Sequence, residues 1–176
     1  MEVEPITQEG YDLLTREFKY LVEVERPKVS REKEVAAALG DRSENADYHA
    51  AKEKLRHIDK RLFFLNALLQ KTQIIAPETL EHSRMHFGAT ITLTNLDNDE
   101  EEEVYTICGT YESEPENGLI TIHAPLSKKL LGKRVGDEFS VTLPHGKKEY
   151  EVEKIEYIGV FALKKVVKTE ADFGFR

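Results

Sequence analysis

Three carboxylates in the segment from Gly40 to Tyr48 are the side chains of this sequence best suited to chemistry. Asp41, Glu44 and Asp47 follow one another at three-residue spacing, so they would face roughly one side of a helix start. Carboxylates can hold Mg²⁺ and can orient or deprotonate water, the two requirements of metal-assisted phosphodiester cleavage. Two or three carboxylates bind Mg²⁺ weakly, so we expect a partner to complete the coordination shell.

The same acids also have an ordinary structural explanation. Acidic residues stabilise the positive end of a helix dipole, and Asp41 or Ser43 could cap a following helix. Asp41 and Glu44 have the D-x-x-E spacing of a capping box. On this short pattern alone, capping is the favoured interpretation. The choice therefore depends on the elements that carry the motif.

An apolar seam follows the motif and predicts a long helix over residues 45–71. Its members alternate in steps of three and four residues, as in a coiled coil. They are Tyr48, Ala51, Leu55, Ile58, Leu62, Leu65 and Leu69. Such a helix spans about 40 Å at 1.5 Å per residue. It cannot bury so long a seam alone, so it needs a partner helix of similar length.

The partner helix is predicted upstream, where the same steps recur. The apolar positions are Tyr11, Leu14, Phe18, Leu21, Val35 and Leu39. Thr7 is a suitable N-cap for this helix. Pro27 removes a helical hydrogen bond, so we expect a bend or break near Glu25 and Arg26. The alternative is a pair of shorter helices in place of one.

A tight reversal between the two helices makes the predicted hairpin antiparallel. Gly40 supplies a helix stop, and only residues 39–45 separate the helices. The carboxylates then lie at the end of a narrow rod, where they could enter a deep and confined site. Capping a helix does not require a rod of this length, which favours a functional role for Asp41 and Glu44.

Beyond Pro77 the apolar period changes to two, which predicts a separate β-rich domain. The candidate strands are residues 89–94, 104–108, 119–123, 139–143 and 150–157, with a short helical turn at 127–131. The predicted class is α+β, with an antiparallel coiled-coil hairpin at 1–76, an antiparallel β domain at 77–158 and a tail at 159–176. Residues 73–78 are the expected linker.

The net charge of −8 over 176 residues argues against a general nucleic-acid binder, because such proteins gain affinity by neutralising phosphates. Residues 1–76 carry 13 basic and 14 acidic side chains, against 12 and 19 in residues 77–176. Only the first part is suited to lie near nucleic acid. No apolar run approaches the roughly 18 residues of a membrane span, and no signal sequence is evident. We therefore expect a cytoplasmic protein with no membrane partner.

Other candidate sites receive ordinary interpretations. Cys108 is the only cysteine, which excludes an internal disulfide, and its apolar surroundings favour a buried small hydrophobe. His82 and His86 are four residues apart, but no third metal ligand follows, so surface or structural histidines are favoured. The acidic run from Asp97 to Glu103 lacks the pattern of a calcium loop and favours a charged hairpin turn.

Several short motifs occur together along the chain. They are Gly10-Tyr11, Arg26-Pro27, Gly40-Asp41-Arg42-Ser43-Glu44-Asn45-Ala46-Asp47-Tyr48, Phe87-Gly88-Ala89, and Pro125 followed by Leu130-Leu131-Gly132-Lys133. With these motifs the chain resembles the bacterial Gre family of transcript-cleavage factors, over nearly its whole length to about Ile158. The resemblance implies a coiled coil that enters the secondary channel of RNA polymerase and an FKBP-like domain that docks near the channel mouth.

The resemblance also implies a function and the residues that perform it. The factor would be a monomeric accessory protein, not an enzyme, that rescues arrested complexes by stimulating the polymerase's own cleavage of backtracked RNA at its extruded 3′ end. Asp41 and Glu44 match the family's catalytic pair, which helps to bind a second Mg²⁺ and to position the attacking water. Ser43 and Asp47 would be supporting residues at the tip. The Mg²⁺ would be held mainly by the polymerase.

A basic stripe on the second helix is a candidate RNA-binding surface. Lys52, Arg56 and Lys60 share a face at four-residue spacing. The sequence alone fits a solvated coiled-coil flank equally well. In the family that the chain resembles, a basic patch contacts the transcript, which favours RNA.

The subtype and the rival functions stay open. Arg42-Ser43, Asn45-Ala46-Asp47-Tyr48 and Ile58-Asp59-Lys60-Arg61 resemble the B type, which we prefer, whereas His49-Ala50-Ala51 resembles the A type. A non-catalytic or inhibitory channel binder is the main rival, because inhibitory relatives share the fold. A prolyl isomerase or chaperone built on residues 77–176 has only fold analogy in its favour. The tail has no assigned role.

Overall fold

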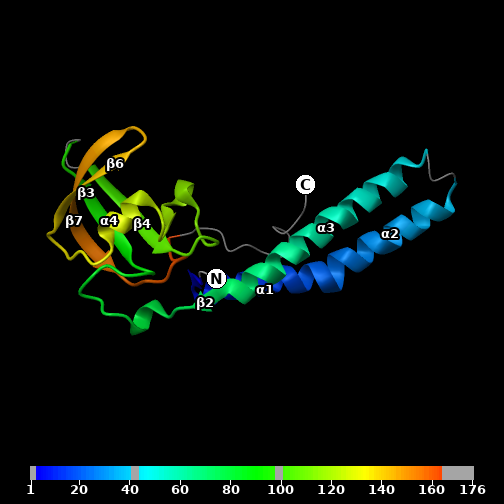
Figure 1. Ribbon diagram of the computed structural model, residues 1–176, viewed down its shortest axis with the longest axis horizontal. Helices are drawn as coiled ribbons and strands as arrows, with labels where there is room; N and C mark the ends of the chain where they lie inside the picture. The colour runs from blue at the N-terminus through cyan, green and yellow to red at the C-terminus, as the bar shows by residue number, and fades with distance from the viewer. Residues whose placement is uncertain (1–2, 41–43, 98–100, 164–176) are drawn as a thin grey trace. The chain divides into compact units, whose positions relative to one another are not determined.

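The computed structural model describes residues 3–40, 44–97 and 101–163, which form two compact units. Among these residues, the hairpin unit begins at Tyr11 and ends at Lys71, and the sheet unit combines residues 3–10 with those from Thr72 to residue 163. Figure 1 shows the paired helices of the hairpin unit and the strands of the sheet unit. The predicted α+β class, a helical hairpin with a β-rich domain, is confirmed. No helix in the described ranges is long and apolar enough to cross a lipid bilayer.

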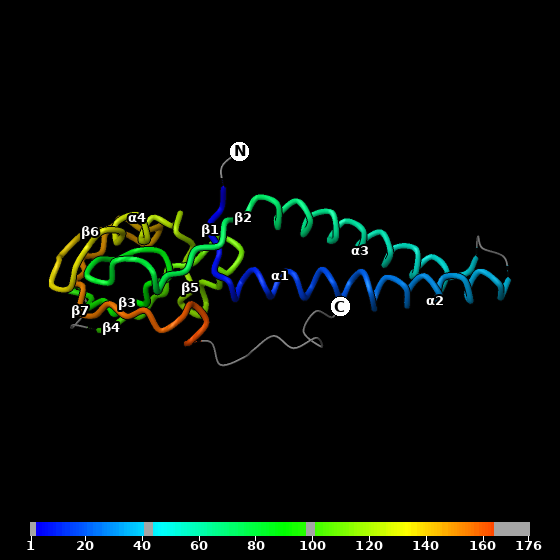
Figure 2. The backbone as a smooth tube through the Cα atoms, turned by 90° about the horizontal axis from the view of Figure 1, so that it is seen from below, coloured from blue at the N-terminus to red at the C-terminus, as the bar shows by residue number. Residues whose placement is uncertain are grey.

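Two helical arms build the hairpin and lie side by side in Figures 1 and 2. The first arm comprises α1 (Gln8–Tyr20), a π-helical turn η1 (Leu21–Glu25) and α2 (Arg26–Ala38), and the second is α3 (Ala46–Lys71). Thr7 caps α1 as predicted, because its Oγ1 accepts a 3.0 Å hydrogen bond from the backbone N–H of Gly10.

The predicted seam on α3 packs against the first arm. The fully packed residues between the arms are Leu21, Val29, Ala51, Ile58 and Leu65, with Leu14, Phe18, Leu55 and Leu62 partly buried beside them. Burial of Ala51, Ile58 and Leu65 at seven-residue intervals confirms the coiled-coil period on this helix.

The π-helical turn changes which residues of the first arm are buried. It closes with the N–H of Arg26 donating to the carbonyl oxygen of Leu21, five residues earlier rather than four. This extra residue shifts the seam by one position, so that Val29 is fully buried while Val35 and Leu39 are 62% and 78% exposed. The predicted burial of Val35 and Leu39 is therefore wrong. The sequence pattern had been extended at α-helical spacing through a turn that is not α-helical.

The turn lies immediately before Pro27, where the sequence predicted a bend or break. In a regular α-helix a proline ring clashes with the carbonyl four residues back and removes one hydrogen-bond donor. The wider turn over Leu21–Glu25 alters the placement of those carbonyls, and Glu25 and Arg26 keep right-handed helical dihedrals. The α-helical bonding is thus interrupted at the expected place, but the arm does not separate into two helices.

Three ion pairs between the arms fix their antiparallel register. The pairs are Glu17 with Arg61, Glu25 with Lys54, and Arg26 with Asp59, with N–O distances of 2.6, 2.6 and 2.8 Å. Glu25 is the last residue of the π-helical turn and is buried, and the hydrogen bond from Lys54 lowers the pKa of Glu25 although burial opposes that shift. A buried carboxylate needs such a partner, so Lys54 contributes to the structure of the hairpin rather than to its basic surface.

The main sheet has five strands in the order β5-β4-β3-β7-β6. Their bounds are Thr90–Asn95 for β3, Glu101–Cys108 for β4, Leu119–Thr121 for β5, Glu138–Leu143 for β6 and Gly146–Glu156 for β7. All neighbouring pairs are antiparallel except β4 and β5, which are parallel. The predicted antiparallel sheet is therefore corrected to a mixed one, because the chain crosses over through residues 109–118 and re-enters in the same direction.

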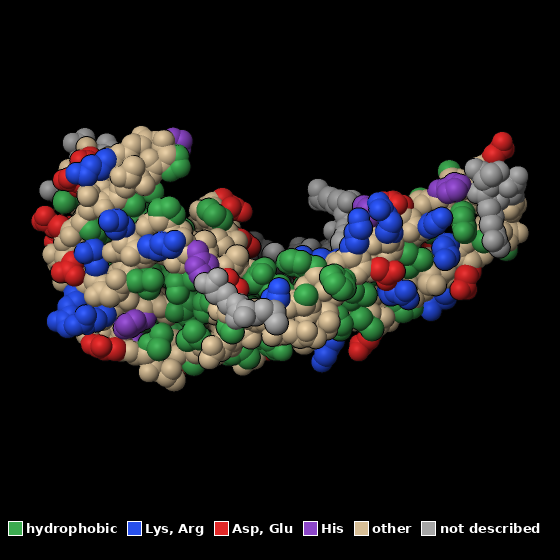
Figure 3. All heavy atoms as spheres, in the orientation of Figure 1, with side chains coloured by type: hydrophobic (Ala, Val, Ile, Leu, Met, Phe, Trp, Pro, Cys, Tyr) green, Lys and Arg blue, Asp and Glu red, His purple; other side chains and the backbone are tan. Residues whose placement is uncertain are grey.

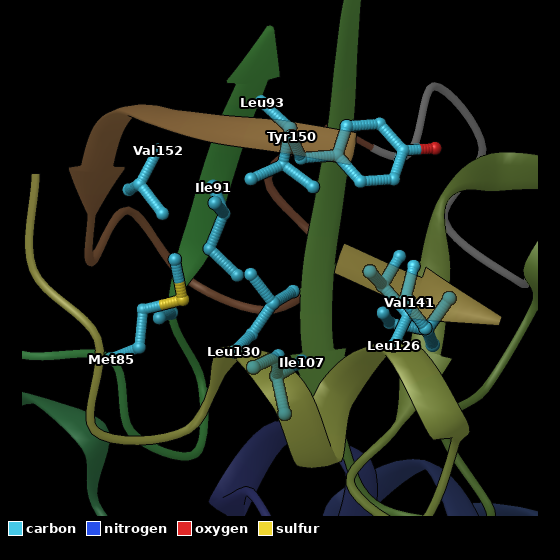
Figure 4. Close-up of a cluster of buried hydrophobic side chains, with 11 residues drawn as sticks. Met85, Ile91, Leu93, Ile107, Leu126, Leu130, Val141, Tyr150 and Val152 are labelled. Atoms are coloured by element: carbon cyan, nitrogen blue, oxygen red, sulfur yellow. The ribbon is translucent and has the colours of Figure 1, made fainter. Parts of the chain in front are cut away.

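The core of this unit lies between the sheet and the helix α4 (Pro125–Leu130). Figure 4 shows its side chains, among them Met85, Ile91, Leu93, Ile107, Leu126, Leu130, Val141, Tyr150 and Val152. Ile91 and Leu93 are fully buried whereas Thr92 and Thr94 are only partly so, which is the two-residue period that the sequence predicted. The hydroxyl of Tyr150 donates to Glu103 at 3.0 Å, so its polar end is paired.

A second, two-stranded sheet places the first residues of the chain in the sheet unit. β1 (Glu4–Ile6) pairs in parallel with β2 (Thr72–Ile74), and the 3₁₀ turn η2 (Pro77–Thr79) follows. The sequence had assigned residues 1–76 to the hairpin domain. In the structure, residues 3–10 lie in the sheet unit, where β1 and β2 satisfy backbone groups of each other.

A buried carboxylate anchors the start of α1 within this unit. Glu112 is 4% exposed, and its Oε1 accepts a 3.0 Å hydrogen bond from the backbone N–H of Thr7 and contacts the Thr7 hydroxyl. Its Oε2 accepts from the backbone N–H of Gly109 at 2.9 Å. A Cβ added to Gly10 would lie 2.2 Å from Oε1, so a larger residue at this position would displace the buried carboxylate. Burial raises the pKa of Glu112, although the bonds from Thr7 and Gly109 oppose the shift.

Candidate functional site

The candidate site is the tip of the hairpin, between the end of α2 at Ala38 and the start of α3 at Ala46. Asp41 and Ser43 lie outside the described residues. Glu44 and Asp47 are both exposed, and Figure 3 shows acidic side chains at this end of the hairpin. The described part of the tip therefore presents its carboxylates to solvent, as the sequence predicted for Glu44 and Asp47.

Asn45, rather than an acid, caps α3. Its Oδ1 accepts a 3.0 Å hydrogen bond from the backbone N–H of Tyr48, which is the bond that an N-cap makes. Its Nδ2 donates to the carbonyl oxygen of Ala36 at 2.6 Å and so ties the two arms together. The predicted caps Asp41 and Ser43 fall outside the described residues, among which Asn45 makes the N-cap bond of α3. Glu44 precedes the cap residue and is exposed.

We expect Asn45→Ala to destabilise the tip by about 1–2 kcal/mol, because it removes both the cap and the bond to Ala36. Asn45→Asp should lose less, since aspartate keeps the capping oxygen and loses only the donor. Hydrogen exchange of the first-turn amides of α3 measures the effect. Equal protection of those amides in the alanine variant and the parent would contradict the capping role.

A shallow groove along the hairpin collects the predicted basic stripe with residues from the first arm. Its lining is Arg26, Lys33, His49, Lys52, Glu53, Leu55, Arg56, Asp59, Lys60 and Phe63. Lys52, Arg56 and Lys60 are all exposed there, so the predicted common face exists. We refer to this surface as the basic groove.

Ion pairs neutralise part of the charge in the basic groove. Arg56 Nε donates to Glu53 at 3.0 Å, and Arg26 is paired with Asp59. The net positive charge of the groove is therefore carried mainly by lysines. Two of them, Lys33 and Lys52, lie on opposite arms. Sequence reasoning missed Arg26 and Lys33, although pairing the arms in antiparallel register would have placed them opposite the stripe.

The described residues of the tip include ligands suited to a magnesium ion, but they do not make a complete coordination shell. Exposed carboxylates such as Glu44 and Asp47 are ligands that Mg²⁺ prefers. Among the described residues, no three His, Cys, Asp or Glu side chains are placed to hold a metal together. The tip can therefore supply ligands to an ion that another molecule also holds.

The remaining sequence candidates have structural contacts. The His82 ring stacks on Tyr157 with centroids 4.1 Å apart, and its Nε2 lies 3.3 Å from the carbonyl oxygen of Pro77. Cys108 is buried, as predicted, and burial raises the pKa of its thiol to about 12. A thiol with so high a pKa is protonated at neutral pH and is a poor nucleophile.

The fold and the site together define a two-unit α+β protein whose helical hairpin ends in exposed acids and carries a basic groove. Residues 4–74 match the family described as "Transcription elongation factor, N-terminal". Residues 80–157 match the family described as "Transcription elongation factor, GreA/GreB, C-term". The chain belongs to the GreA/GreB family of transcription elongation factors.

Named relatives agree with this assignment. "Transcription elongation factor GreA" of Nautilia profundicola is 47% identical over 89% of this chain and 96% of its own length. The proteins of that name from Aliarcobacter butzleri and Helicobacter hepaticus are 48% and 45% identical over 89% of this chain and 97% and 96% of theirs. All three are named GreA, so the preference for the B type receives no support from them.

Among solved structures, the chain is similar to GreA factor homolog 1 of Thermus thermophilus. The two are 24% identical, the match covers 89% of this chain and 99% of the other, and the TM-score is 0.41. A GreA/GreB factor from Nitrosomonas europaea is 20% identical over 62% of this chain and 93% of its own, with a TM-score of 0.40.

Proposed function

We propose that this chain binds RNA polymerase, inserts its hairpin into the secondary channel and stimulates the polymerase's own cleavage of backtracked RNA. The observation that carries the proposal is the tip: Glu44 is exposed and stands outside the capped helix, because Asn45 makes the cap. An exposed acid at the end of a helix pair about 40 Å long is placed to reach a recessed site. The factor is then an accessory to an enzyme rather than an enzyme itself.

Asp41 and Glu44 perform the chemistry in this proposal. Their carboxylates would hold a Mg²⁺ ion together with ligands of the polymerase, and that ion supplies positive charge and acidifies bound water. Glu44 orients a water molecule by accepting its proton or hydrogen bond. Ser43 and Asp47 support the pair. Asp47, in the first turn of α3, also interacts favourably with the positive end of the helix dipole.

The basic groove holds the extruded RNA in this proposal. Lys52, Arg56 and Lys60 lie on one face of α3 below the tip, and Lys33 adds a charge from the opposite arm. Neutralisation of phosphates by these side chains would retain the displaced strand near the tip. The RNA 3′ end is thus the second partner, after the polymerase.

Several finer features complete the proposal. The names of the relatives favour the A type, in agreement with His49-Ala50-Ala51. The sheet unit would dock at the channel mouth as an FKBP-like domain, and the factor would act as a monomer in the cytoplasm. None of these features requires a residue outside those already named.

Addition of the purified protein to an arrested elongation complex tests the function directly. With RNA labelled at its 5′ end, we expect the labelled RNA to become shorter as its 3′-terminal fragment is released. The shortened RNA should be extended again when nucleotides are supplied. Elongation blocked without any shortening of the RNA would instead identify a non-catalytic channel binder. Cleavage of free RNA by the protein alone would identify a nuclease and contradict the accessory role.

A further inference from the structure

One aromatic side chain of the basic groove is mostly exposed to solvent. Phe63 is 79% exposed and lines the groove with Arg56 and Lys60. The neighbouring Phe64 is only 45% exposed, and the Arg61 guanidinium lies 5.3 Å from the centre of its ring. The two adjacent phenylalanines therefore differ, since Phe64 is engaged by the protein and Phe63 is presented to solvent.

The placement of Phe63 continues the basic stripe. Lys52, Arg56, Lys60 and Phe63 follow one another in steps of four, four and three residues, which keeps them on one face of α3. Phe63 lies roughly 16 Å beyond Lys52 along the helix axis at 1.5 Å per residue. A row of cations that ends in an exposed ring is the arrangement by which proteins bind single-stranded nucleic acid, with phosphates on the cations and a base on the ring.

We propose that Phe63 is a base-stacking platform for the extruded single-stranded RNA. This inference rests on the proposed function, and it assigns a specificity-determining residue within the basic groove. The ligand is single-stranded, because bases of a duplex are already stacked on each other and offer no free face to the ring. A polymerase surface is the competing occupant, but the net positive charge of the basic groove favours a polyanion.

The position of Phe63 also sets the length of RNA that it can touch. It lies 17 residues after the start of α3 at Ala46, which is roughly 26 Å at 1.5 Å per residue. A stacked strand advances about 3.4 Å per nucleotide, so about eight stacked nucleotides reach from the tip to the ring, and fewer if the strand is extended. Phe63 should therefore act on deeply backtracked RNA and have progressively less effect as the extruded strand is shortened.

Arrested complexes assembled with an eight-nucleotide extruded 3′ strand test the inference, using either normal RNA or RNA with abasic residues in that strand. For the unaltered factor, we expect the concentration that gives half-maximal cleavage to rise about tenfold when the bases are removed. With Phe63→Leu, the concentration that gives half-maximal cleavage of normal RNA should already be about tenfold higher than with the parent. Removal of the bases should not raise it further. Phe63→Trp should retain the difference, and the matched control Phe64→Leu should behave as the parent.

Two other outcomes overturn the stacking role. If Phe63→Leu keeps the full difference between normal and abasic RNA, the ring does not stack. If it weakens cleavage of both RNAs equally, Phe63 contacts the polymerase instead. If the parent protein stimulates no cleavage at all, the proposed function fails, and the stacking role is then decided by fluorescence. Quenching of a 2-aminopurine octaribonucleotide at low salt should occur with the parent protein and be absent with Phe63→Leu.

Discussion

Replacement of Glu44 by alanine is expected to lower the rate of stimulated cleavage about 100-fold or more, and Asp41→Ala should have a comparable effect. Each substitution removes one of the two carboxylates that orient water and complete the metal shell. Glu44 is exposed and lies outside α3, so its loss should leave the hairpin folded. Single-turnover cleavage of an arrested complex, at saturating factor, measures the change.

Retention of binding distinguishes this catalytic loss from a failure to dock. Both variants should compete with the parent factor for polymerase at an unchanged concentration, because the substituted side chains belong to the tip alone. Glu34→Ala is a matched control, since it removes an exposed acid from α2 without touching the tip motif. Undiminished cleavage by either tip variant, or an equal loss in the control, would contradict the roles assigned to Asp41 and Glu44.

The long helices were predictable because the apolar spacing that indicates them lies within each helix. The seam on α3 depends only on apolar spacing, and Ala51, Ile58 and Leu65 are buried where that spacing placed them. The same reasoning failed beyond Leu21, where one extra residue in a π-helical turn moved Val35 to the surface. Pro27 signalled an interruption there, but a proline does not tell whether the helix bends, breaks or widens.

The cap of α3 shows that a local rule can leave several residues eligible. Asp41, Ser43 and Asn45 are all good caps by type, and the D-x-x-E spacing favoured the first. The structure selects Asn45 because its amide makes two bonds at once, accepting from Tyr48 and donating to Ala36. Only a side chain with both a donor and an acceptor can do this, and the need for the donor arises from the other arm.

Contacts between distant parts of the chain were beyond the reach of sequence patterns. The parallel pairing of β4 with β5 and of β1 with β2 depends on how the connections cross, which the two-residue period does not encode. Glu112 gave no sequence signal at all, because it contacts Thr7 across 105 residues. For the candidate site, the type and exposure of Glu44 followed from sequence, whereas the opposite wall of the basic groove required the register of the arms.

Loss of the Glu112 side chain is the second large effect that we expect. Glu112→Ala should reduce the free energy of unfolding of the sheet unit by roughly 3 kcal/mol or more, because the buried N–H groups of Thr7 and Gly109 lose their acceptor. Thr142→Ala, an exposed change on β6, is a suitable control. Urea unfolding followed through the amide signals of β3 and β7 measures both variants, and equal stability of the two would contradict the anchoring role.

The same carboxylate gives stability a pH dependence whose sign can be stated. Burial raises the pKa of Glu112 above its ordinary value of 4.5, so the native state binds this proton more tightly than the unfolded chain does. The resulting stabilisation is complete below the unfolded pKa and is lost as the pH rises through the folded pKa. Glu112→Gln cannot titrate, so the unfolding free energy of the parent minus that of the variant should fall as the pH rises above about 4.5, the ordinary pKa of a glutamate. A difference that stays constant over this range would show that the hydrogen bonds from Thr7 and Gly109 cancel the effect of burial on the pKa of Glu112. A difference that grows would show that these bonds outweigh it.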